Sequence, residues 1–458
     1  MRSRSRCSMR YIGIDIGTTS ICGAVIDTKR RRIIASITKD NRSFIRTSRT
    51  WERIQDTEKI ITTAENILTS LLRKYPNIRG IGVTGQMHGI VYVDKNGNAA
   101  SPLMTWQDGR AGLPYRKTTY AGSLSAATGY AVAPGFGMAT HYYNIITRCV
   151  PKNASSFCTI QDHLVMRLTG ANEPRIDATN AASFGVFNLR SLRFDERALQ
   201  KAGIGAALLP KIVPSGIKAG TWRGIPVYTA LGDNQASFLG SVKDICRTAL
   251  INIGTGAQIS AYTERYAAVP GVDTRPFPGG GYLLVGASLC GGKSYALLHQ
   301  FFERTLSFFG EKDPGDIFDL MNALKIGTLA ERLTVDTRFA GTRTDASVRG
   351  SISNISMDNL TPEHLIVGFC DGMTDELYDM YNRMPKTVRG RVRSLTGSGN
   401  GLRKNALLRA IVKERFGHPI RFTLHREEAA VGAALSAFVG SGNGDFLSAG
   451  RMLSYENR

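Results

Sequence analysis

The chain has 458 residues, more than a single hydrophobic core usually organises, so we expect two large domains. Its 42% hydrophobic and 21% charged residues are typical of a globular protein, and it contains no uninterrupted apolar run of about 18 residues that would span a membrane. The 58 Lys and Arg residues exceed the 37 Asp and Glu residues and give a net charge of +21, which is compatible with nucleic acid, an acidic surface or an anionic substrate as partner.

The basic residues are spread along the chain in short clusters, which we interpret as solvated surface, so no specific nucleic acid and no membrane is expected as a partner. Residues 1–10 form a basic N-terminal tail without the apolar segment of a secretory signal. A targeting tail and an upstream start are both open interpretations of this segment. We expect a cytoplasmic protein, with organellar targeting left open by the tail.

A glycine-rich hairpin is predicted at the start of the chain and again in its second half. Residues 11–27 (YIGIDIGTTSICGAVID) and 249–262 (ALINIGTGAQISAY) share an apolar strand, an Asp or Asn, Ile-Gly-Thr and a second strand. Glycine permits close backbone approach, and the N–H groups of such a turn can cradle an anion. Asp15 at the strand end would repel a phosphate unless a cation lies between them, so magnesium is implied. Two such turns favour a nucleotide held between two related domains.

Helices and strands alternate between the two hairpins. Apolar residues from Ile60 to Leu72 fall on one helical face, and the strand-like segment IRGIGVTG follows them at 78–85. The segment GIPVYTALGD at 224–233 predicts another strand that ends on a carboxylate. This order predicts an N-terminal domain over residues 11–243.

The second half continues with a long helix after Thr361, with Pro362 and Glu363 in its first turn. The polar run GSGNG at 440–444 indicates a turn. We therefore predict a C-terminal domain over residues 244–438 and a terminal segment over 439–458.

Two other features, a near-match to a phosphate loop and the set of histidines, do not indicate a functional site. The segment ASLCGGKS at 287–294 nearly matches a phosphate loop, but Ala287 stands where the first glycine belongs, so we interpret it as a helix start after a strand. The seven histidines show no paired metal-ligand spacing, which argues against a zinc site.

Seven segments, read in chain order, resemble the FGGY family of carbohydrate kinases. They are IGIDIGTTS, GVTGQMHG, TWQDGRA, TIQDHLVMRLTG, LGDNQASFLGS, INIGTGAQ and LTGSGNGLRKNALL, and the resemblance runs from about Tyr11 to about Phe438. It implies an α/β fold of two actin-like, ribonuclease H-like domains that flank a cleft for ATP and a sugar.

The resemblance also implies roles for individual residues. Asp233 of LGDNQAS would be the general base that takes the proton of the attacking sugar hydroxyl, and Asp15 would hold Mg²⁺. The residues implied to bind ATP are Thr18, Thr19 and Ser20 in the first turn, Gly254, Thr255 and Gly256 in the second, and Gly397, Ser398, Gly399 and Asn405 near the adenosine. Many relatives have three consecutive glycines where this chain has Gly397-Ser398-Gly399.

A sugar pocket needs directional hydrogen-bonding groups and an apolar or aromatic wall. By resemblance, that wall would consist of Gln86, Met87, His88, Trp106, Asp108 and Asn234. For Met87 and Trp106 the alternative is core packing, and for His88 it is a hydrogen bond to the backbone.

The substrate implied by the resemblance is a ketose. TWQDGRA, TIQD and DATNAASFGVFN are most similar to members that convert sedoheptulose to sedoheptulose 7-phosphate, whereas GQMHG is shared with members that act on xylulose. Xylulose, ribulose and glycerol remain alternative substrates within the family. A sugar-independent ATPase of the actin type would share the two phosphate turns but would not need the GQMHG, WQDGR and GDNQAS segments.

Overall fold

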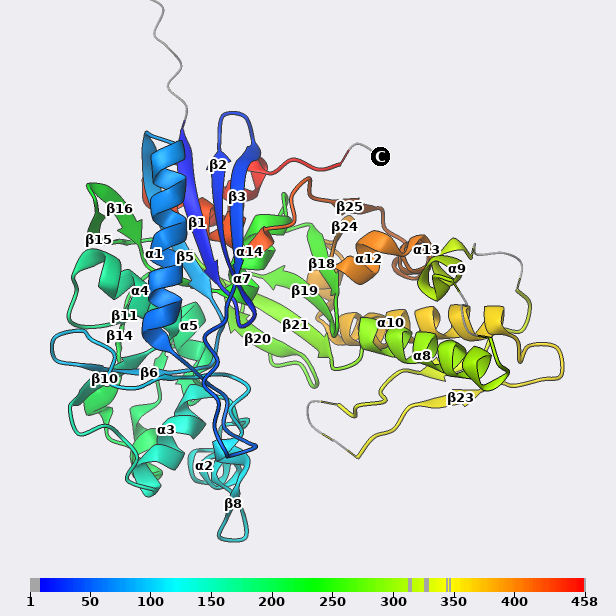
Figure 1. Cartoon of the computed structure of the whole chain (residues 1–458), viewed down its shortest axis with the longest axis horizontal. Helices are drawn as coiled ribbons and strands as arrows, with labels where there is room; N and C mark the ends of the chain where they lie inside the picture. Colours follow the sequence, from blue (N-terminus) through cyan, green and yellow to red (C-terminus); the bar gives the residue numbers. More distant parts are fainter. Residues whose placement is uncertain (1–8, 312–314, 325–328, 343–344, 346, 457–458) are drawn as a thin grey trace, which may run out of the picture. The chain divides into compact units, whose positions relative to one another are not determined.

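The computed structural model describes residues 9–311, 315–324, 329–342, 345 and 347–456. They form two compact units, which are described separately (Figure 1). Among the described residues, the first unit comprises residues 9–243, Arg275–Gly281 and His425–Ser454. The second comprises Asp244–Thr274, the described part of Tyr282–Leu424, and residues 455–456. Residues 1–8 of the expected basic tail lie outside the described residues, and Arg10 already begins a strand.

The first unit is built on a seven-stranded mixed sheet with the order β15-β16-β5-β1-β2-β3, in which β17 also pairs with β5. The hairpin predicted at 11–27 is present, because β1 and β2 are antiparallel, while β5 runs parallel to β1. The strands are β1 (Arg10–Ile16), β2 (Ser20–Asp27), β3 (Arg32–Asp40), β5 (Ile78–Gly85), β15 (Lys218–Trp222), β16 (Ile225–Tyr228) and β17 (Leu231–Gly232). The strand expected at 224–233 is thus split into β16 and β17.

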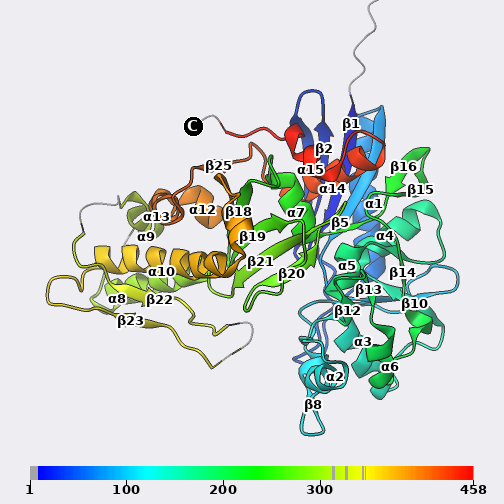
Figure 2. The same ribbon diagram turned by 180° about the vertical axis from the view of Figure 1, so that it is seen from behind.

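Helices cover both faces of this sheet, which explains why β1 and β5 are buried almost throughout. Helix α1 (Thr57–Lys74) begins at the cap residue Asp56 and packs Ile67 and Leu71 near Gly23 of β2. Helix α14 (Glu428–Gly440) lies on the opposite face, as the two views in Figures 1 and 2 show.

Glycines allow α14 to approach the sheet. A Cβ atom on Gly13 of β1 would collide with the carbonyl oxygen of Ala430, and one on Gly82 of β5 would collide with that of Ala433. The helix therefore lies backbone to backbone against two neighbouring strands.

Between β5 and β15 the chain forms a series of helices and short strands outside the main sheet. Its elements, with those that flank it, are β4 (Ile54–Gln55), β6 (Val91–Asp94), β7 (Leu103–Met104), β8 (Pro114–Tyr115), β9 (Thr118–Thr119), α2 (Tyr120–Thr128), α3 (Gly137–Ile146), β10 (Ala154–Cys158), α4 (Ile160–Thr169), β11 (Arg175–Ile176), α5 (Ala178–Ser183), β12 (Phe187–Asn188), β13 (Arg193–Phe194), α6 (Glu196–Lys201) and β14 (Lys211–Ile212). Helix α7 (Asp233–Ser241) follows β17, and α15 (Phe446–Ala449) follows α14.

The second unit repeats the sheet pattern of the first. Its six strands have the order β20-β21-β19-β18-β24-β25, with an antiparallel meander followed by two parallel strands. They are β18 (Thr248–Ile253), β19 (Ala257–Thr263), β20 (Asp273–Pro276), β21 (Tyr282–Ser288), β24 (Ser394–Ser398) and β25 (Ile420–Phe422). The internal repeat expected from the two hairpins is therefore confirmed.

Helix α10 (Pro362–Arg383) is the long helix expected after Thr361, whose side chain accepts a hydrogen bond from His364 N. It buries Phe369, Met373 and Leu377 in the core of the second unit. The other elements are α8 (Gly292–Phe308), α9 (Ile317–Ala323), β22 (Thr334–Asp336), β23 (Ser351–Ser353), α11 (Lys386–Arg389), α12 (Asn400–Lys404) and α13 (Ala406–Phe416).

The C-terminal domain was predicted as the continuous range 244–438, but the units of the structure are not continuous in sequence. The first boundary agrees with Lys243, but residues 425–454 pack within the first unit, and so do residues 275–281. The physical reason is the close packing of α14 on β1 and β5. The run at 440–444 forms the turn between α14 and α15, with Gly442 and Gly444 at positive φ.

Within the described part of the chain, no helix is long and apolar enough to cross a membrane.

Candidate active site

Three parallel strands of the first unit end at one edge of the sheet and carry the predicted catalytic residues. Ile16 of β1 pairs with Gly85 of β5, and Gly85 pairs with Gly232 of β17. Asp15 precedes Ile16, and Asp233 follows Gly232 as the first residue of α7. The structure therefore brings Asp15 and Asp233 together, as the general rule that sites lie at the carboxyl ends of parallel strands leads one to expect.

The two carboxyl groups are half-buried and influence each other. Burial raises the pKa of Asp15 from 3.8 to about 7, with a further contribution from the charge of Asp233. Burial also raises the pKa of Asp233 to about 6, although Arg275 and backbone hydrogen bonds of Asn234 and Met87 act to lower it. Carboxyl groups with raised pKa values at a strand edge are typical of acid–base sites.

The first turn, between β1 and β2, is held by two side chains that the sequence did not single out. Asn41 donates through Nδ2 to the carbonyl oxygen of Gly17 at 2.8 Å and through its backbone N–H to that of Thr19 at 2.8 Å. Gln55 donates through Nε2 to the carbonyl oxygen of Thr18 at 3.0 Å. Because all three carbonyl groups are engaged, the conformation of the turn is fixed before any ligand binds.

Trp106, Thr18 and Gln86 form a hydrogen-bonded wall beside this turn. Trp106 Nε1 donates to Thr18 Oγ1 at 2.9 Å, and Thr18 Oγ1 donates to Gln86 Oε1 at 3.2 Å. Gln86 Nε2 donates in turn to Gln55 Oε1 at 2.8 Å. Trp106 is 48% exposed, so its indole ring presents an aromatic surface while its N–H group is fixed. The hydroxyl of Thr18, predicted to bind ATP, is engaged in this wall, whereas Thr19 is exposed and Ser20 is half-buried.

Met87 and His88 have different surroundings. Met87 is buried, and its Sδ atom lies 2.8 Å from the position that a Cβ of Gly232 would occupy, so it packs directly beside Asp233. His88 adopts a left-handed conformation with φ 72°, and its Nδ1 lies 2.7 Å from the carbonyl oxygen of Ser183. Its ring stacks on Phe136 with a centroid separation of 4.6 Å. The imidazole is therefore oriented from two sides and remains half-buried.

Asp108 is buried and its carboxylate is engaged by neighbouring groups. The residue is 1% exposed, and its carboxylate accepts hydrogen bonds from Arg110 Nε at 2.6 Å and from the backbone N–H of Arg53 at 2.9 Å. Arg110 also donates to Asn144 at 3.0 Å. The ion pair fixes the loop that carries Trp106.

The first turn of α7 places further polar groups beside Asp233. Asn234 is half-buried, and its Oδ1 atom has no hydrogen-bond partner among the described residues, as is also true of Gln235 Oε1. Gln235 Nε2 donates to the carbonyl oxygen of Pro276 at 3.0 Å, and this contact brings the segment that carries Arg275 close to α7. Arg275 was not predicted as a site residue because no recognisable motif surrounds it.

The second unit brings its two predicted turns together at the equivalent edge of its own sheet. Asn252 of β18 pairs with Ser398 of β24, so the turn at Gly254–Gly256 and the segment Gly397–Gly399 are neighbours. Gly399 has φ 83°, and a Cβ there would come within 2.5 Å of Asn252 Oδ1. A side chain is therefore excluded at this position.

Ser398 and Asn405 are both buried. Asn405 caps α13 by accepting a hydrogen bond from Leu408 N at 2.9 Å. Its expected place near the adenine base stays a prediction.

The segment ASLCGGKS forms the end of β21 and the start of α8, as expected. It also supports the second turn, because Gly292 N donates to the carbonyl oxygen of Gly254 at 2.7 Å and Lys293 N donates to that of Thr255 at 3.0 Å.

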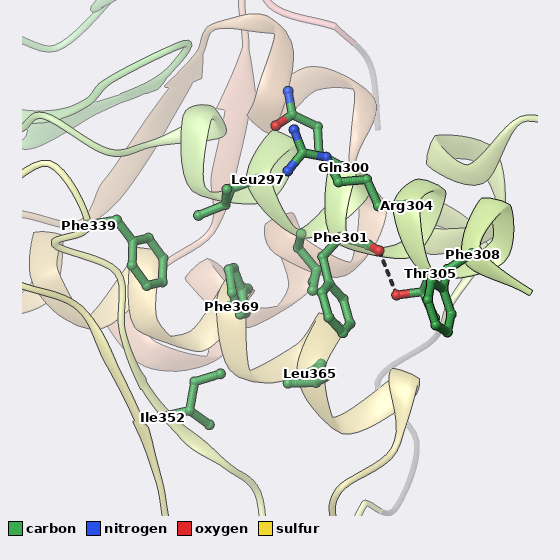
Figure 3. Close-up of a pocket in the computed structure, with 11 residues that line it drawn as sticks. Leu297, Gln300, Phe301, Arg304, Thr305, Phe308, Phe339, Ile352, Leu365 and Phe369 are labelled. Atoms are coloured by element: carbon green, nitrogen blue, oxygen red, sulfur yellow. Dashed lines mark hydrogen bonds between the residues drawn. The ribbon is translucent and has the colours of Figure 1, made fainter.

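A separate apolar groove lies beside α8 and α10, with a volume of about 550 Å³ (Figure 3). Leu297, Phe301, Phe339, Leu365 and Phe369 converge on it. No acidic residue is among the described residues that line the groove, so it lacks the groups that phosphoryl transfer needs.

The residues near Asp15 fit a magnesium ion. Asp15 Oδ1 is buried and has no hydrogen-bond partner among the described residues, which leaves a carboxylate oxygen available to a cation. The described residues contain no cluster of three or more His, Cys, Asp or Glu side chains that could hold a metal alone. This sparse donor set suits Mg²⁺, which often binds through one or two carboxylates together with water and substrate phosphates.

The repeated sheets and the paired carboxylates define a two-domain α/β protein with an actin-like fold. The solved structure of a gluconate kinase from Lactobacillus acidophilus shares this fold, with a TM-score of 0.83 at 21% identity over 98% of this chain and 93% of that one. The models of the N- and C-terminal domains of the FGGY family of carbohydrate kinases match residues 10–240 and 249–441. The chain belongs to this family and is a carbohydrate kinase.

Curated relatives differ in the sugars that their names record. Sedoheptulokinase from Mus musculus is 30% identical over 93% of this chain and 96% of its own length. Xylulose kinase from Lactococcus lactis is 25% identical over 96% of this chain and 90% of its own length.

Proposed function

We propose that this protein transfers the terminal phosphoryl group of ATP to sedoheptulose and forms sedoheptulose 7-phosphate. The observation that carries the proposal is the pair Asp15 and Asp233 at the shared end of β1 and β17, beside the wall of Trp106, Thr18 and Gln86. The identity to the mouse sedoheptulokinase favours sedoheptulose. Xylulose is the second candidate, since a xylulose kinase also matches nearly the whole chain.

Asp233 is the proposed general base. A pKa of about 6 leaves its carboxylate deprotonated near neutral pH, yet basic enough to accept a proton from the attacking hydroxyl. Arg275 and the N–H groups of Asn234 and Met87 stabilise the charged form. Asn234 Oδ1, which lacks a partner among the described residues, is the proposed acceptor for a neighbouring sugar hydroxyl.

The sugar is proposed to lie against Trp106, with Met87 and His88 completing the wall. Because Asp108 is fully engaged by Arg110 and Arg53, its proposed role is to position the loop of Trp106. Each unit contains one glycine-rich turn, and we propose a phosphate-binding role for the turn of each unit. In the first turn the donors are Thr19, Ser20 and the backbone, since the Thr18 hydroxyl belongs to the wall.

Asp15 is the proposed magnesium ligand. The ion, when bound, neutralises charge on the phosphate oxygens. Without a cation, the raised pKa of Asp15 means that burial works against its charged form, so the carboxyl group is suited to a site where a cation is present.

The variant Asp233→Asn tests the proposed base. The amide has nearly the same shape but cannot accept the proton, so kcat should fall by about 10²-fold or more. The thermal midpoint and the binding of an ATP analogue, measured by calorimetry, should stay near those of the wild type. Turnover close to the wild-type rate in the folded variant would remove Asp233 from this role.

A further inference from the structure

The segment just before Asp233 is held by an unusual set of side chains. β17 contains only Leu231 and Gly232, so its own strand pairing with β5 is short. Helix α7 begins immediately afterwards, and its N-cap residue Gly232 has no side chain to cap it. Other groups must therefore fix the direction of the backbone where β17 ends and α7 begins at Asp233.

Three buried side chains hold this segment. Each forms one hydrogen bond with a different residue, and the three residues are consecutive. Asn180 Nδ2 donates to the carbonyl oxygen of Ala230 at 3.2 Å, and Thr84 Oγ1 donates to that of Leu231 at 2.9 Å. The hydroxyl of Thr179 accepts a hydrogen bond from Gly232 N at 2.8 Å. Thr84, Thr179 and Asn180 therefore fix the backbone of residues 230–232.

Thr179 is itself held in place by a buried carboxyl group. Its hydroxyl donates to Asp177 Oδ1 at 2.6 Å, and Ser215 Oγ donates to Asp177 Oδ2 at 2.7 Å. The proton of the Thr179 hydroxyl is therefore committed to Asp177, and an oxygen lone pair faces Gly232 N. The geometry orients one particular peptide group, the one between Leu231 and Gly232, whose carbonyl oxygen accepts from Thr84 and whose N–H donates to Thr179.

Resting on the proposed role of Asp233, we infer that Thr179 is a positioning residue that aligns this carboxylate through the hydrogen bond to Gly232 N. Residue 232 is glycine, so the N-cap of α7 has no side chain of its own to fix the start of the helix. A Cβ at this position would come within 2.9 Å of both Met87 Sδ and Gln235 Oε1. The catalytic carboxylate thus takes its orientation from α5, a helix distant from it in the sequence.

The inference predicts a specific kinetic pattern for Thr179→Val. Valine matches the shape of threonine but cannot accept the hydrogen bond from Gly232 N. A misplaced catalytic group lowers the rate of the chemical step, so kcat should fall by roughly 10- to 100-fold. The KM values for sugar and ATP should change by less than about threefold, since the groups that bind them are untouched. Thr179→Ser retains the hydroxyl and should restore kcat to within about threefold of the wild type.

Ser215→Ala is the matched control. It removes a hydrogen bond to the same carboxylate of Asp177 but leaves the contact to Gly232 in place. If Thr179 acts by positioning, kcat should fall in Thr179→Val and stay near the wild-type value in Ser215→Ala, even where both variants lower the thermal midpoint. Thr179→Ala provides a second variant in case valine impairs folding, and it should also lower kcat.

The inference is overturned if folded Thr179→Val or Thr179→Ala keeps the wild-type kcat, if Ser215→Ala reduces kcat equally, or if only KM changes. Asp233→Asn, assayed in parallel, separates the two proposals. Normal turnover in Asp233→Asn contradicts the proposed base, whereas loss in Asp233→Asn combined with normal kcat in Thr179→Val contradicts only the positioning role.

Discussion

At the scale of single residues, the site depends on polar groups that are fixed before a ligand binds. The Thr18 hydroxyl is shared between Trp106 and Gln86, and Asp108 is neutralised by Arg110. Rigid placement of this kind lowers the cost of ordering side chains during binding and catalysis. The wall is therefore formed in advance by its own hydrogen bonds.

A buried histidine in α4 gives a prediction about pH. His163 is fully buried, and neither ring nitrogen has a hydrogen-bond partner among the described residues. Burial lowers its pKa from 6.5 to about 4, with a smaller contribution from Arg167. Between pH 6.5 and 4 the unfolded chain binds a proton that the folded chain does not, so the free energy of unfolding falls as the pH falls through this range.

Replacing His163 by Leu should remove this contribution. Between pH 7 and pH 5 the free energy of unfolding of the wild type should decrease by about 2 kcal/mol more than that of His163→Leu. Urea unfolding of both proteins at the two pH values measures the difference. An equal decrease in both proteins would show that His163 does not contribute.

At the scale of elements, close packing of α14 on the sheet decides the limits of the first unit. Gly13 and Gly82 lie on adjacent strands and leave no space for a Cβ atom beneath the helix. The helix is correspondingly rich in small residues, with Ala430, Ala433 and Ala434 all buried. Small residues on both surfaces allow the backbones to approach.

Gly82→Ala should therefore destabilise the first unit. The added methyl group would collide with the carbonyl oxygen of Ala433, so α14 must move away from β5, and we expect a loss of about 3 kcal/mol in the free energy of unfolding. Gly205→Ala is the control, because Gly205 has φ −79° and no neighbouring atom within 4 Å of the added Cβ. This control should stay within about 1 kcal/mol of the wild type. Chemical denaturation compares the two, and equal stability would contradict the packing account.

At the scale of the whole chain, local patterns predicted the elements better than the boundaries between the units. The two hairpins, the helix at 57–74 and the cap at Thr361 follow from turn composition, apolar spacing and capping chemistry, all of which are local in sequence. The return of residues 425–454 to the first unit depends on contacts between segments about 400 residues apart, for which one sequence carries no signal.

For the candidate site as well, local sequence patterns could be recognised, whereas contacts between distant segments could not. Asp15 and Asp233 could be predicted because each stands beside a recognisable glycine-rich or motif segment at a strand end. Asn41, Gln55 and Arg275 could not, because their contribution lies in contacts across the fold that leave no pattern around them. For Asn405, the motif did not indicate the local role that the structure shows, which is to cap α13.

The measurement that tests the central claim most directly is a comparison of sugars with the purified protein, magnesium and ATP. ADP release would be followed with sedoheptulose, xylulose, ribulose and glycerol, and the phosphorylated product identified by mass. We predict the highest kcat/KM with sedoheptulose and formation of sedoheptulose 7-phosphate. Turnover of xylulose without turnover of sedoheptulose would contradict the substrate assignment, and ATP hydrolysis that no sugar accelerates would contradict the proposed reaction.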